Sequence, residues 1–464
     1  MLRIFRQLYT IRNLFFVLAE AFFIYISVIV TSYMLLGFGV FDLDRWLIYK
    51  ALIISFVSIV CLYYNNVYDL SITKKYSELG IRLMQAFGAS LIILAGIYGA
   101  FNDVMICRGF FLFYLPVVMS LIAFWRFIFL SILKKGFLNE RIILLGSGEI
   151  CQGIIDKIGE QIDCGFTLVG VVEEIFAEKG LIISDNNIIR LSGYENLYTK
   201  ARQADVDKIV VAIREKRGAF PINELLKCRV EGLEIIQGNS FYEMLTGKLI
   251  VSSTNPTWFI FSEGFNKTWL RTTLKRIEDI LAALILLIVL SPVILFTVCL
   301  IKIDSKGPLI YSQERLGRRK KPYKVHKFRS MRSDAEKNTG PVWAKKNDDR
   351  VTRIGHFIRK WRIDEIPQLW NVLKGDMSLV GPRPEREFFI NQLEEKIPYY
   401  SERFSVKPGL TGWAQVCYGY GDSIEDAIEK LNYDLFYIKN MSIFMDIVII
   451  FRTVKTVIFG VGAR

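Results

Sequence analysis

The sequence contains little histidine and no cysteine motif. Its 464 residues include two histidines, His326 and His356, so a histidine-based metal site or a Ser-His-Asp triad has little material. The seven cysteines form no C-x-x-C pair, and several lie in apolar stretches, which indicates reduced core residues rather than a disulfide or zinc framework. No recognised nucleic-acid-binding motif is present, so we expect no nucleic-acid partner. Any catalysis therefore has to rest on carboxylates, lysines and arginines.

Apolar residues and positive charge, by contrast, are abundant. Hydrophobic residues make up 52% of the chain and include 34 phenylalanines, which is high for a soluble protein and favours a membrane protein. The formal net charge of +13 suits anionic lipid headgroups and phosphorylated substrates, since the basic residues crowd around apolar runs. A chain of this length is expected to form two or three domains, because single cores rarely exceed about 250 to 300 residues.

Four apolar runs in the N-terminal third each approach the roughly 20 residues that span a bilayer. They cover residues 14–36, 47–64, 83–101 and 110–133. Lysine and arginine cluster before the first run, between the second and third, and after the fourth, so the positive-inside rule places both ends of the bundle in the cytoplasm. The first run is too long for a signal peptide. We expect a transmembrane four-helix bundle over residues 1–136, with buried helices of a large soluble core as the alternative.

Residues 137–250 alternate expected strands with expected helices, an order typical of a parallel, Rossmann-like α/β domain. The strands are expected at 141–145, 167–172 and 208–213, and the helices at 149–159 and 221–229. Gly146-Ser147-Gly148 follows the first strand, and Glu173 follows the second at a distance that suits a ribose-binding acid. However, Cys151 stands where a dinucleotide motif needs its third glycine. The sequence therefore leaves open a dinucleotide site and a structural or regulatory module.

A further apolar run, residues 280–303, contains Ser291-Pro292 in its interior. Proline removes a backbone hydrogen bond and kinks a helix. Strong positive charge on both flanks means that both ends of the run prefer the cytoplasm. A re-entrant helix over about residues 276–303, which enters the membrane, breaks and returns, satisfies this preference. The alternative is an ordinary kinked span, which would place the following residues outside the cell.

The stretch from residue 354 to 385 carries adjacent carboxylates, Asp364 and Glu365, among several cations. Pro367 follows, and proline is favoured in the first turn of a helix, so we expect the pair at a helix start with the helix continuing over 368–373. A helix N-terminus keeps a carboxylate ionised and favours a phosphate beside it. An ionised carboxylate among cations is a plausible nucleophile toward phosphorus. The alternative is an N-cap acid flanked by solvated charges.

Several spaced motifs accompany this stretch in a fixed order. They are Ser291-Pro292, QERLG at 313–317, KFRSM at 327–331, GPRPE at 381–385 and KPGLTGWAQV at 407–416. Together they resemble bacterial sugar transferases of the monotopic phosphoglycosyl transferase family, also called polyprenyl-phosphate hexose-1-phosphate transferases. The resemblance covers about residues 269–464, and the N-terminal part looks like that of the large, exopolysaccharide-type members.

The resemblance implies a membrane-bound phosphotransferase that uses a UDP-sugar and undecaprenyl phosphate. Asp364 would attack the β-phosphorus, release UMP and form a covalent phosphosugar-aspartyl intermediate. The lipid phosphate would then take the sugar phosphate, as the first membrane step of exopolysaccharide assembly. The implied location is the bacterial inner membrane, with the active site on the cytoplasmic face.

The resemblance also implies roles for individual residues. Asp364 is the catalytic nucleophile and Glu365 its partner, and the two are the candidate ligands of Mg²⁺. Lys327, Arg359 and Arg383 correspond to residues that hold substrate phosphates, although an exposed basic residue without a role is the alternative for Lys327 and Arg383. By the same resemblance, Pro382 and Pro384 belong to a loop near the site, while Ser291 and Pro292 break the re-entrant helix.

One departure leaves the donor open. Residues 417–422 read CYGYGD, where many relatives carry an arginine within an Asn-Gly-Arg-Asn-like run, so the cation that contacts the nucleotide is not identified. The segment LFYIKN at 435–440 and the terminal GVGAR resemble exopolysaccharide-assembly members, which favours a plain hexose such as glucose or galactose.

The expected organisation is a membrane bundle, an α/β domain at 137–250, a linker at 251–268 and an α+β catalytic domain at 269–464. Amphipathic segments at 431–439 and 443–459 suit either the membrane interface or the core. A homodimer is a hypothesis. Two other functions stay open: a membrane-anchored nucleotide-sugar oxidoreductase or epimerase that uses the Rossmann-like domain, and a non-catalytic assembly scaffold.

Overall fold

A computed structural model describes most of the chain, and its described residues form two compact units. The units cover residues 2–241 and 242–464. The described residues are 11–37, 45–69, 76–101, 105–107, 109–134, 136, 139–160, 164–172, 188–191, 193–213, 220–252, 264–265, 267–304, 307–332, 350–419, 421 and 423–458.

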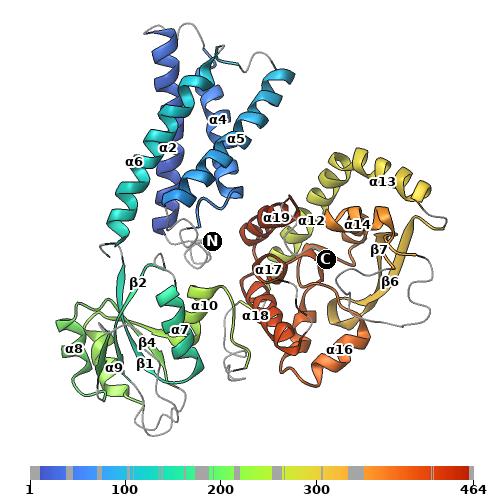
Figure 1. The fold of residues 1–464 in the computed structure, drawn as a ribbon. Coiled ribbons are helices and arrows are strands. Elements are labelled where there is room, and N and C mark those ends of the chain that lie inside the picture. Colours follow the sequence, from blue (N-terminus) through green and yellow to red (C-terminus); the bar gives the residue numbers. More distant parts are fainter. Residues whose placement is uncertain are drawn as a thin grey trace. The chain divides into compact units, whose positions relative to one another are not determined.

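The first unit begins with four long apolar helices (Figure 1). They are α2 (Ile11–Leu36), α4 (Leu47–Tyr64), α5 (Tyr76–Ala100) and α6 (Phe110–Lys134). All four predicted helices are confirmed, but α5 begins before residue 83, because its first two turns are more polar than the apolar run that marked it. Inward-facing Ile24 and Leu94 are fully buried, while Phe22 and Leu112 are exposed. Helices that are apolar on both faces are typical of membrane spans.

An ion pair lies inside these helices. Arg126 of α6 donates from Nε to Glu20 Oε1 of α2 at 2.6 Å and from Nη1 to the Val67 carbonyl at 2.9 Å. The guanidinium also lies over the Phe16 ring, 5.1 Å from its centroid. Glu20 is fully buried and Arg126 is 2% exposed. Because a charge in an apolar interior is costly unless it is paired, these contacts hold α2, α6 and the residues after α4 in one arrangement.

A parallel α/β domain follows in the same unit, as the sequence predicts. Its five strands have the order β3-β2-β1-β4-β5, and all four pairings are parallel. The strands are β1 (Glu140–Gly146), β2 (Phe166–Val172), β3 (Ile189–Leu191), β4 (Lys208–Ala212) and β5 (Glu234–Gln237). The helices are α7 (Glu149–Glu160), α8 (Leu197–Gln203), α9 (Ile222–Val230) and α10 (Gly238–Thr246). The sequence predicted three of the strands but neither edge strand, because both edges are short.

The glycine loop after β1 has a packing role of its own. Gly146 has a φ of +124°, and a Cβ there would lie 2.5 Å from the carbonyl oxygen of Ala212 on the neighbouring strand. Only glycine tolerates both conditions. Cys151, at the position of the missing third glycine, is fully buried. Glu173, the candidate ribose-binding acid, lies outside the described residues.

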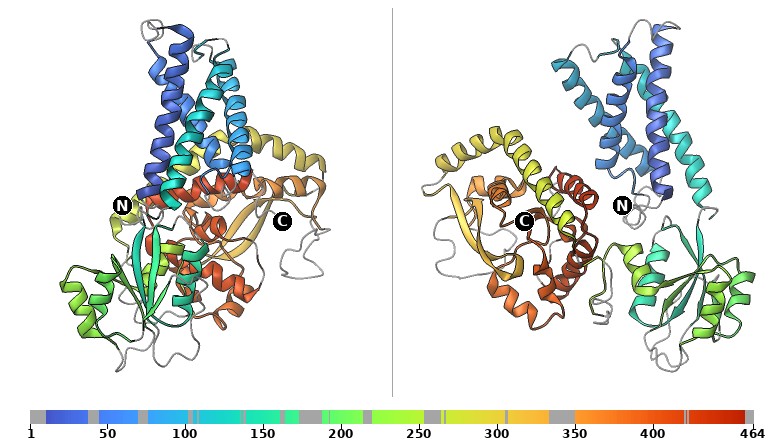
Figure 2. Two further views of the ribbon diagram at one scale, coloured as in Figure 1. Left: turned by 60° about the vertical axis from the view of Figure 1, so that its left-hand side comes forward. Right: turned by 180° about the vertical axis from the view of Figure 1, so that it is seen from behind.

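The second unit contains a sharply bent pair of apolar helices, α12 (Trp269–Val289) and α13 (Ser291–Asp304), visible from behind in Figure 2. Their axes differ by 61°. Leu290 separates the two helices, and Pro292 lies in the first turn of α13, where its missing N–H costs no helical hydrogen bond. The helices break beside the predicted Ser291-Pro292. Leu281, Ile288 and Phe296 are exposed, so the pair presents apolar surface on both arms.

The base of α12 is bonded to the rest of this unit. Lys275 Nζ lies 2.8 Å from Asp279 Oδ1 and 2.8 Å from Asp446 Oδ2. Asp279 Oδ1 also accepts hydrogen bonds from Ser378 Oγ and from the Leu379 N–H, each at 3.0 Å. These buried contacts tie the bent helix pair to β8 (Ser378–Val380), the strand that precedes the GPRP loop.

Short strands and helices complete the second unit. β6 (Ile310–Leu316) and β7 (Pro322–Phe328) form an antiparallel hairpin, and β8 pairs in parallel with β9 (Gly409–Thr411). The remaining helices are α14 (Arg353–Lys360), α15 (Gln368–Lys374), α16 (Glu387–Glu394), α17 (Trp413–Cys417), α18 (Ile424–Asn440) and α19 (Ile443–Ile458). Leu435 and Phe436 of α18 are fully buried, so this helix packs in the core. α19 buries Ile449 but exposes Ile447.

Candidate active site

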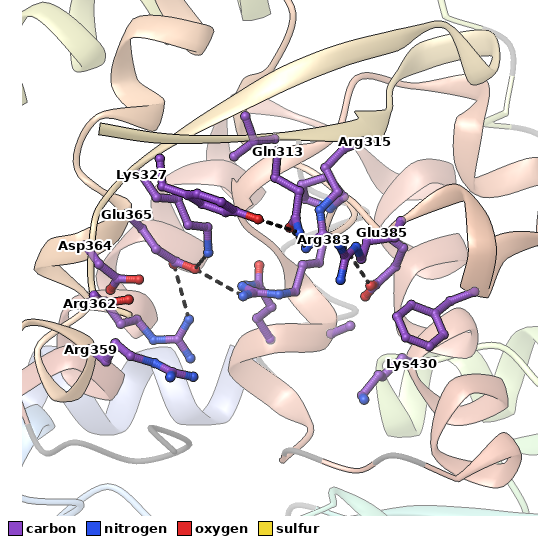
Figure 3. Close-up of a pocket in the computed structure, with 18 of the residues that line it drawn as sticks. Gln313, Arg315, Lys327, Arg359, Arg362, Asp364, Glu365, Arg383, Glu385 and Lys430 are labelled. Atoms are coloured by element: carbon purple, nitrogen blue, oxygen red, sulfur yellow. Dashed lines mark hydrogen bonds and ion pairs between the residues drawn. The ribbon is translucent and has the colours of Figure 1, made fainter. Parts of the chain in front are cut away.

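A cavity of about 700 Å³ opens in the second unit. Its lining combines the β6–β7 hairpin, the carboxylate pair, the loop after β8, and residues of α17 and α18 (Figure 3). The lining is rich in charged residues, which include Arg315, Lys327, Arg359, Arg362, Asp364, Glu365, Arg383, Glu385 and Lys430. Elements far apart in the sequence therefore meet around one charged cavity.

The hairpin supplies one wall through its alternation of side chains. Gln313 and Arg315 of β6, and Val325 and Lys327 of β7, line the cavity. Residues two apart on a strand point to the same face, so this pattern follows from regular strand geometry. The main-chain N–H of His326 and the carbonyl of Lys324 are both bonded to the side chain of Asn371, which fixes β7 against α15.

The carboxylate pair lies in a 3-10 turn, η3 (Ile363–Glu365), between α14 and α15. Arg362 precedes the turn in the left-handed region, with a φ of 52°, and Pro367 is the N-cap of α15. The pair was expected at the start of the helix that continues over 368–373. It instead occupies a separate turn directly before that helix. Both carboxylate residues are 8% exposed.

Glu365 is the carboxylate that the cations hold. Its Oε1 accepts from Lys327 Nζ at 2.9 Å and from Arg383 Nη2 at 3.1 Å, and its Oε2 lies 3.6 Å from Arg362 Nη1 (Figure 3). Burial by itself raises the pKa of Glu365, but Lys327, Arg383 and Arg362 together bring that pKa well below its usual range. Glu365 is therefore ionised throughout the physiological pH range.

Asp364 has a different environment. Within the described part of the chain its side chain forms no hydrogen bond or ion pair, and it lines the cavity. Burial raises the pKa of Asp364 to about 6, and the charge of Glu365 adds to this rise, while Lys327, Arg359 and Arg383 oppose it. The expectation that the helix start and the cations keep a carboxylate ionised thus applies to Glu365. For Asp364, burial outweighs the cations.

The structure brings together most of the residues that the sequence singled out. The cavity that the carboxylate pair lines is also lined by Lys327, Arg359, Arg383 and Pro384. The described lining does not include Pro382, whose carbonyl instead accepts the Gly409 N–H at 2.9 Å. It also does not include Ser291 and Pro292, which lie at the bend between α12 and α13.

Other charged residues of the cavity were not predicted. Arg315 lies 3.7 Å from Glu385. The two residues belong to the motifs QERLG and GPRPE, so motif membership was a signal that could have identified them. Arg362 is one of the cations that flank the carboxylate pair in the sequence. Arg403 and Asp434 also line the cavity and pair with each other at 3.0 Å. Nothing in the sequence connects these two residues, because they come from separate elements, η4 (Tyr400–Ser405) and α18.

The donor set suits a metal that is shared with a substrate. Among the described residues no group of three His, Cys, Asp or Glu side chains could hold a metal ion alone. Mg²⁺, however, is usually bound by one or two carboxylates and completes its coordination with water and substrate phosphates. Asp364 and Glu365 provide two such carboxylates, and Asp364 has no competing partner among the described residues. Because Glu365 is already bonded to Lys327, Arg383 and Arg362, the residues present fit a Mg²⁺ that is held chiefly by Asp364 and by substrate phosphates.

Comparison with known proteins shows the family to which the chain belongs. The sequence profile described as bacterial sugar transferase matches residues 270–460, and one described as a CoA-binding domain matches residues 64–227. The chain is 32% identical over 394 residues to the UDP-glucose:undecaprenyl-phosphate glucose-1-phosphate transferase of Klebsiella pneumoniae, covering 81% of this chain and 80% of the relative. The chain therefore belongs to the bacterial sugar transferase family, and the resemblance predicted from its motifs is confirmed.

Two further relatives differ in their sugar. The UDP-N-acetylgalactosamine-undecaprenyl-phosphate N-acetylgalactosaminephosphotransferase of Aeromonas hydrophila is 40% identical over 240 residues, 52% of this chain and 56% of the relative. The undecaprenyl-phosphate galactose phosphotransferase of Salmonella typhimurium is 29% identical over 384 residues, 78% of each protein. The chain thus matches just over half the length of the Aeromonas relative. All three relatives are named as transferases to undecaprenyl phosphate.

Proposed function

We propose that this protein transfers a sugar 1-phosphate from a UDP-sugar to undecaprenyl phosphate and releases UMP, as the first membrane step of exopolysaccharide assembly. The observation that carries the proposal is the carboxylate dyad in a cavity with an excess of cations. Such a cavity suits a diphosphate, whose negative charge repels an anionic nucleophile until cations neutralise it. The names of the three relatives support the same transfer.

The reaction divides into two displacements at phosphorus. In the first, a carboxylate oxygen of Asp364 attacks the β-phosphorus, the bond from that phosphorus to the bridging oxygen breaks, and UMP leaves. In the second, a phosphate oxygen of the lipid attacks the same phosphorus and Asp364 is released as a carboxylate. Arg359, Lys327 and Arg383 are positioned to hold the phosphate oxygens. Mg²⁺ held by Asp364 and Glu365 would further neutralise the charge of the donor.

The unlike environments of the two carboxylates support this division of roles. A carboxylate of higher pKa is the more basic and the better nucleophile, and with a pKa of about 6 Asp364 is largely ionised at neutral pH. Glu365 is committed to three cations and is a poor nucleophile. It holds Lys327, Arg362 and Arg383 around the position of the reacting phosphate.

We also infer that α12 and α13 form a re-entrant membrane helix. The 61° bend, the exposed apolar side chains of both arms and the basic residues at both ends support this reading. With the four apolar helices as spans, the active site would lie on the cytoplasmic face of the inner membrane, where UDP-sugars are made. A kinked single span would place the cavity on the other side.

The identity of the sugar remains a prediction. The relatives act on glucose, galactose and N-acetylgalactosamine donors according to their names, so they do not discriminate a plain hexose from an N-acetylhexosamine. For the α/β domain we propose a Rossmann-like structural or regulatory module, supported by its strand order. The glycine loop after β1 was the signal for a dinucleotide-dependent oxidoreductase. Close packing against Ala212 accounts for Gly146 in that loop without a dinucleotide, so among the described residues this signal no longer favours an oxidoreductase. A homodimer is a hypothesis that cross-linking in native membranes would test. A purely monomeric band would contradict it.

The decisive experiment identifies the nucleotide that leaves. Protein purified in detergent or nanodiscs is incubated with Mg²⁺, undecaprenyl phosphate and a panel of UDP-hexoses and UDP-N-acetylhexosamines. Release of UMP is expected, and the productive donor names the sugar. Release of UDP would mean glycosyl transfer and would overturn attack on phosphorus. Without the lipid, stoichiometric UMP release with labelling of the protein is expected for the wild type and not for Asp364→Asn.

A further inference from the structure

A buried ion pair at the edge of the cavity contacts the loop that carries Arg383. Arg403 Nη2 donates to Asp434 Oδ2 and to the main-chain carbonyl of Arg383, each at 3.0 Å. Its Nη1 donates to the hydroxyl of Tyr400, and the guanidinium lies 5.0 Å from the centroid of that ring. One arginine thus joins η4, α18 and the GPRP loop.

Burial makes these contacts mutually dependent. Arg403 is 8% exposed and Asp434 is 2% exposed. Removal of the guanidinium would leave a buried carboxylate and a backbone carbonyl without their donor, and such groups are costly unless they are bonded. The fork of an arginine serves several acceptors at fixed angles, which a lysine cannot reproduce.

The preceding part of the loop is held by other contacts. Gly381 donates its N–H to the Thr411 carbonyl at 2.9 Å, and the Pro382 carbonyl accepts the Gly409 N–H at 2.9 Å. A Cβ on Gly381 would lie 2.5 Å from the Lys407 carbonyl oxygen, so the strands approach closely here. These bonds end at residue 382. The next carbonyl, that of Arg383, is the one that Arg403 holds.

The orientation of Arg383 matters because its side chain reaches the dyad. Arg383 Nη2 donates to Glu365 Oε1 at 3.1 Å (Figure 3). A main chain that is free to rotate at residue 383 would move this guanidinium away from both Glu365 and the bound phosphate. Displacement of a phosphate-holding group by about 1 Å is enough to lower a rate on the order of 100-fold.

We propose that Arg403, supported by Asp434, is a positioning residue that fixes the main chain at residue 383 so that Arg383 reaches Glu365 and the donor phosphate. This inference rests on the proposed phosphosugar transfer. Arg403 acts through Arg383 and has no phosphate contact of its own in this scheme. Removal of Arg403 is therefore expected to lower kcat in the wild type, but not to lower it further in a variant that already lacks Arg383.

The test is a double-mutant cycle on UMP release by the full-length protein in nanodiscs. Arg403→Met and Arg383→Ala are each expected to lower kcat by about 10- to 100-fold, with a smaller change in KM for the donor. The double variant is expected within about threefold of Arg383→Ala alone. Arg403→Lys should recover part of kcat, because an ammonium still donates to one of the acceptors.

A matched control removes a partly buried cation of the same unit. Lys439 lies on α18 five residues after Asp434, and Lys439→Met breaks its pair with Glu243, which is 1% exposed. It is expected to lower thermal stability yet keep kcat. If Arg403→Met does not fold, the cycle is run with Asp434→Asn, which weakens the same network. Losses that multiply in the double variant, or full kcat in both Arg403→Met and Asp434→Asn, would overturn the inference. An inactive wild type would instead overturn the proposed function.

Discussion

The N-terminal bundle of four apolar helices and the cavity both bury charged side chains, but these charges are paired differently. In the bundle, Glu20 meets one cation, Arg126, which also donates to the Val67 carbonyl and packs on an aromatic ring. In the cavity, Glu365 alone meets three cations, and Asp364 beside it bonds none of the described residues. The bundle holds a matched pair, whereas the cavity holds an excess of positive charge and an uncommitted carboxylate.

This difference separates charges that stabilise a fold from charges that can act on a substrate. Loss of one partner of a matched buried pair strongly destabilises the fold. Neither partner of such a pair is available to bind a ligand. The excess cations of the cavity repel one another until an anion binds. In the proposed reaction, the diphosphate of the donor supplies that anion. Substitutions in the two regions test this separation.

The largest effect is expected for Asp364→Asn. Asparagine keeps the shape of the side chain but cannot attack phosphorus, so UMP release should fall by at least about 1,000-fold. Because burial raises the pKa of Asp364 to about 6, its ionised form is disfavoured in the folded protein, and the variant should unfold at an equal or higher temperature at pH 8. Asp376→Asn, the same change at a residue paired with Lys374, is the control and should keep the rate. An active Asp364→Asn would require another nucleophile.

A smaller loss of rate, with a loss of stability, is expected for Glu365→Gln. Three cations lose their carboxylate, so the rate should fall about 10- to 100-fold and the free energy of unfolding by about 3 kcal/mol. Glu365 has a depressed pKa, so its stabilisation is present above its unfolded pKa and is lost as the pH falls below that value. Calorimetry against pH and UMP release measure the two effects. A variant as stable as the wild type would contradict the assigned cation contacts.

The third effect is a shift of the pH profile. Single-turnover UMP release without lipid acceptor should rise with pH through about 6, as Asp364 becomes ionised. Lys327 lowers the pKa of Asp364, so Lys327→Met should move this limb to higher pH by about one unit. Glu365 raises that pKa, so Glu365→Gln should move the limb to lower pH. Lys374→Met, which removes an exposed cation, should leave it in place. If Lys327→Met and Glu365→Gln both moved the rise of the rate in the same direction on the pH axis, the assignment of this rise to Asp364 would be refuted.

The smallest effect on rate is expected in the bundle. Glu20→Gln makes the same chemical change as Glu365→Gln and leaves Arg126 buried without its counter-charge. Unfolding in detergent should become easier by about 3 kcal/mol, while kcat per folded molecule stays unchanged. Thermal unfolding and UMP release on one preparation give both values. A fall in kcat comparable to that of Glu365→Gln would break the comparison, because the bundle's pair would then take part in the chemistry.

Much of the architecture could be predicted from local sequence signals. Long apolar runs predicted four helices, alternating patterns predicted the parallel sheet, and Ser291-Pro292 marked the helix bend to within a residue. The start of α5 at Tyr76 was missed because its first turns are polar, and β3 and β5 were missed because short edge strands carry little pattern. Residue 173 and most of the expected linker at 251–268 lie outside the described residues, so those predictions stay predictions.

The site could be predicted in part. The motifs identified Asp364, Glu365, Lys327, Arg359 and Arg383, and the structure gathers all five in one cavity. The sequence by itself determined which chemical groups are available, because residue types and spaced motifs are local properties. Only the tertiary structure decided that the cations bind Glu365, that burial raises the pKa of Asp364, and that Arg403 holds the loop of Arg383. Those outcomes depend on burial and on partners from distant elements, and adjacent side chains in one turn point in different directions.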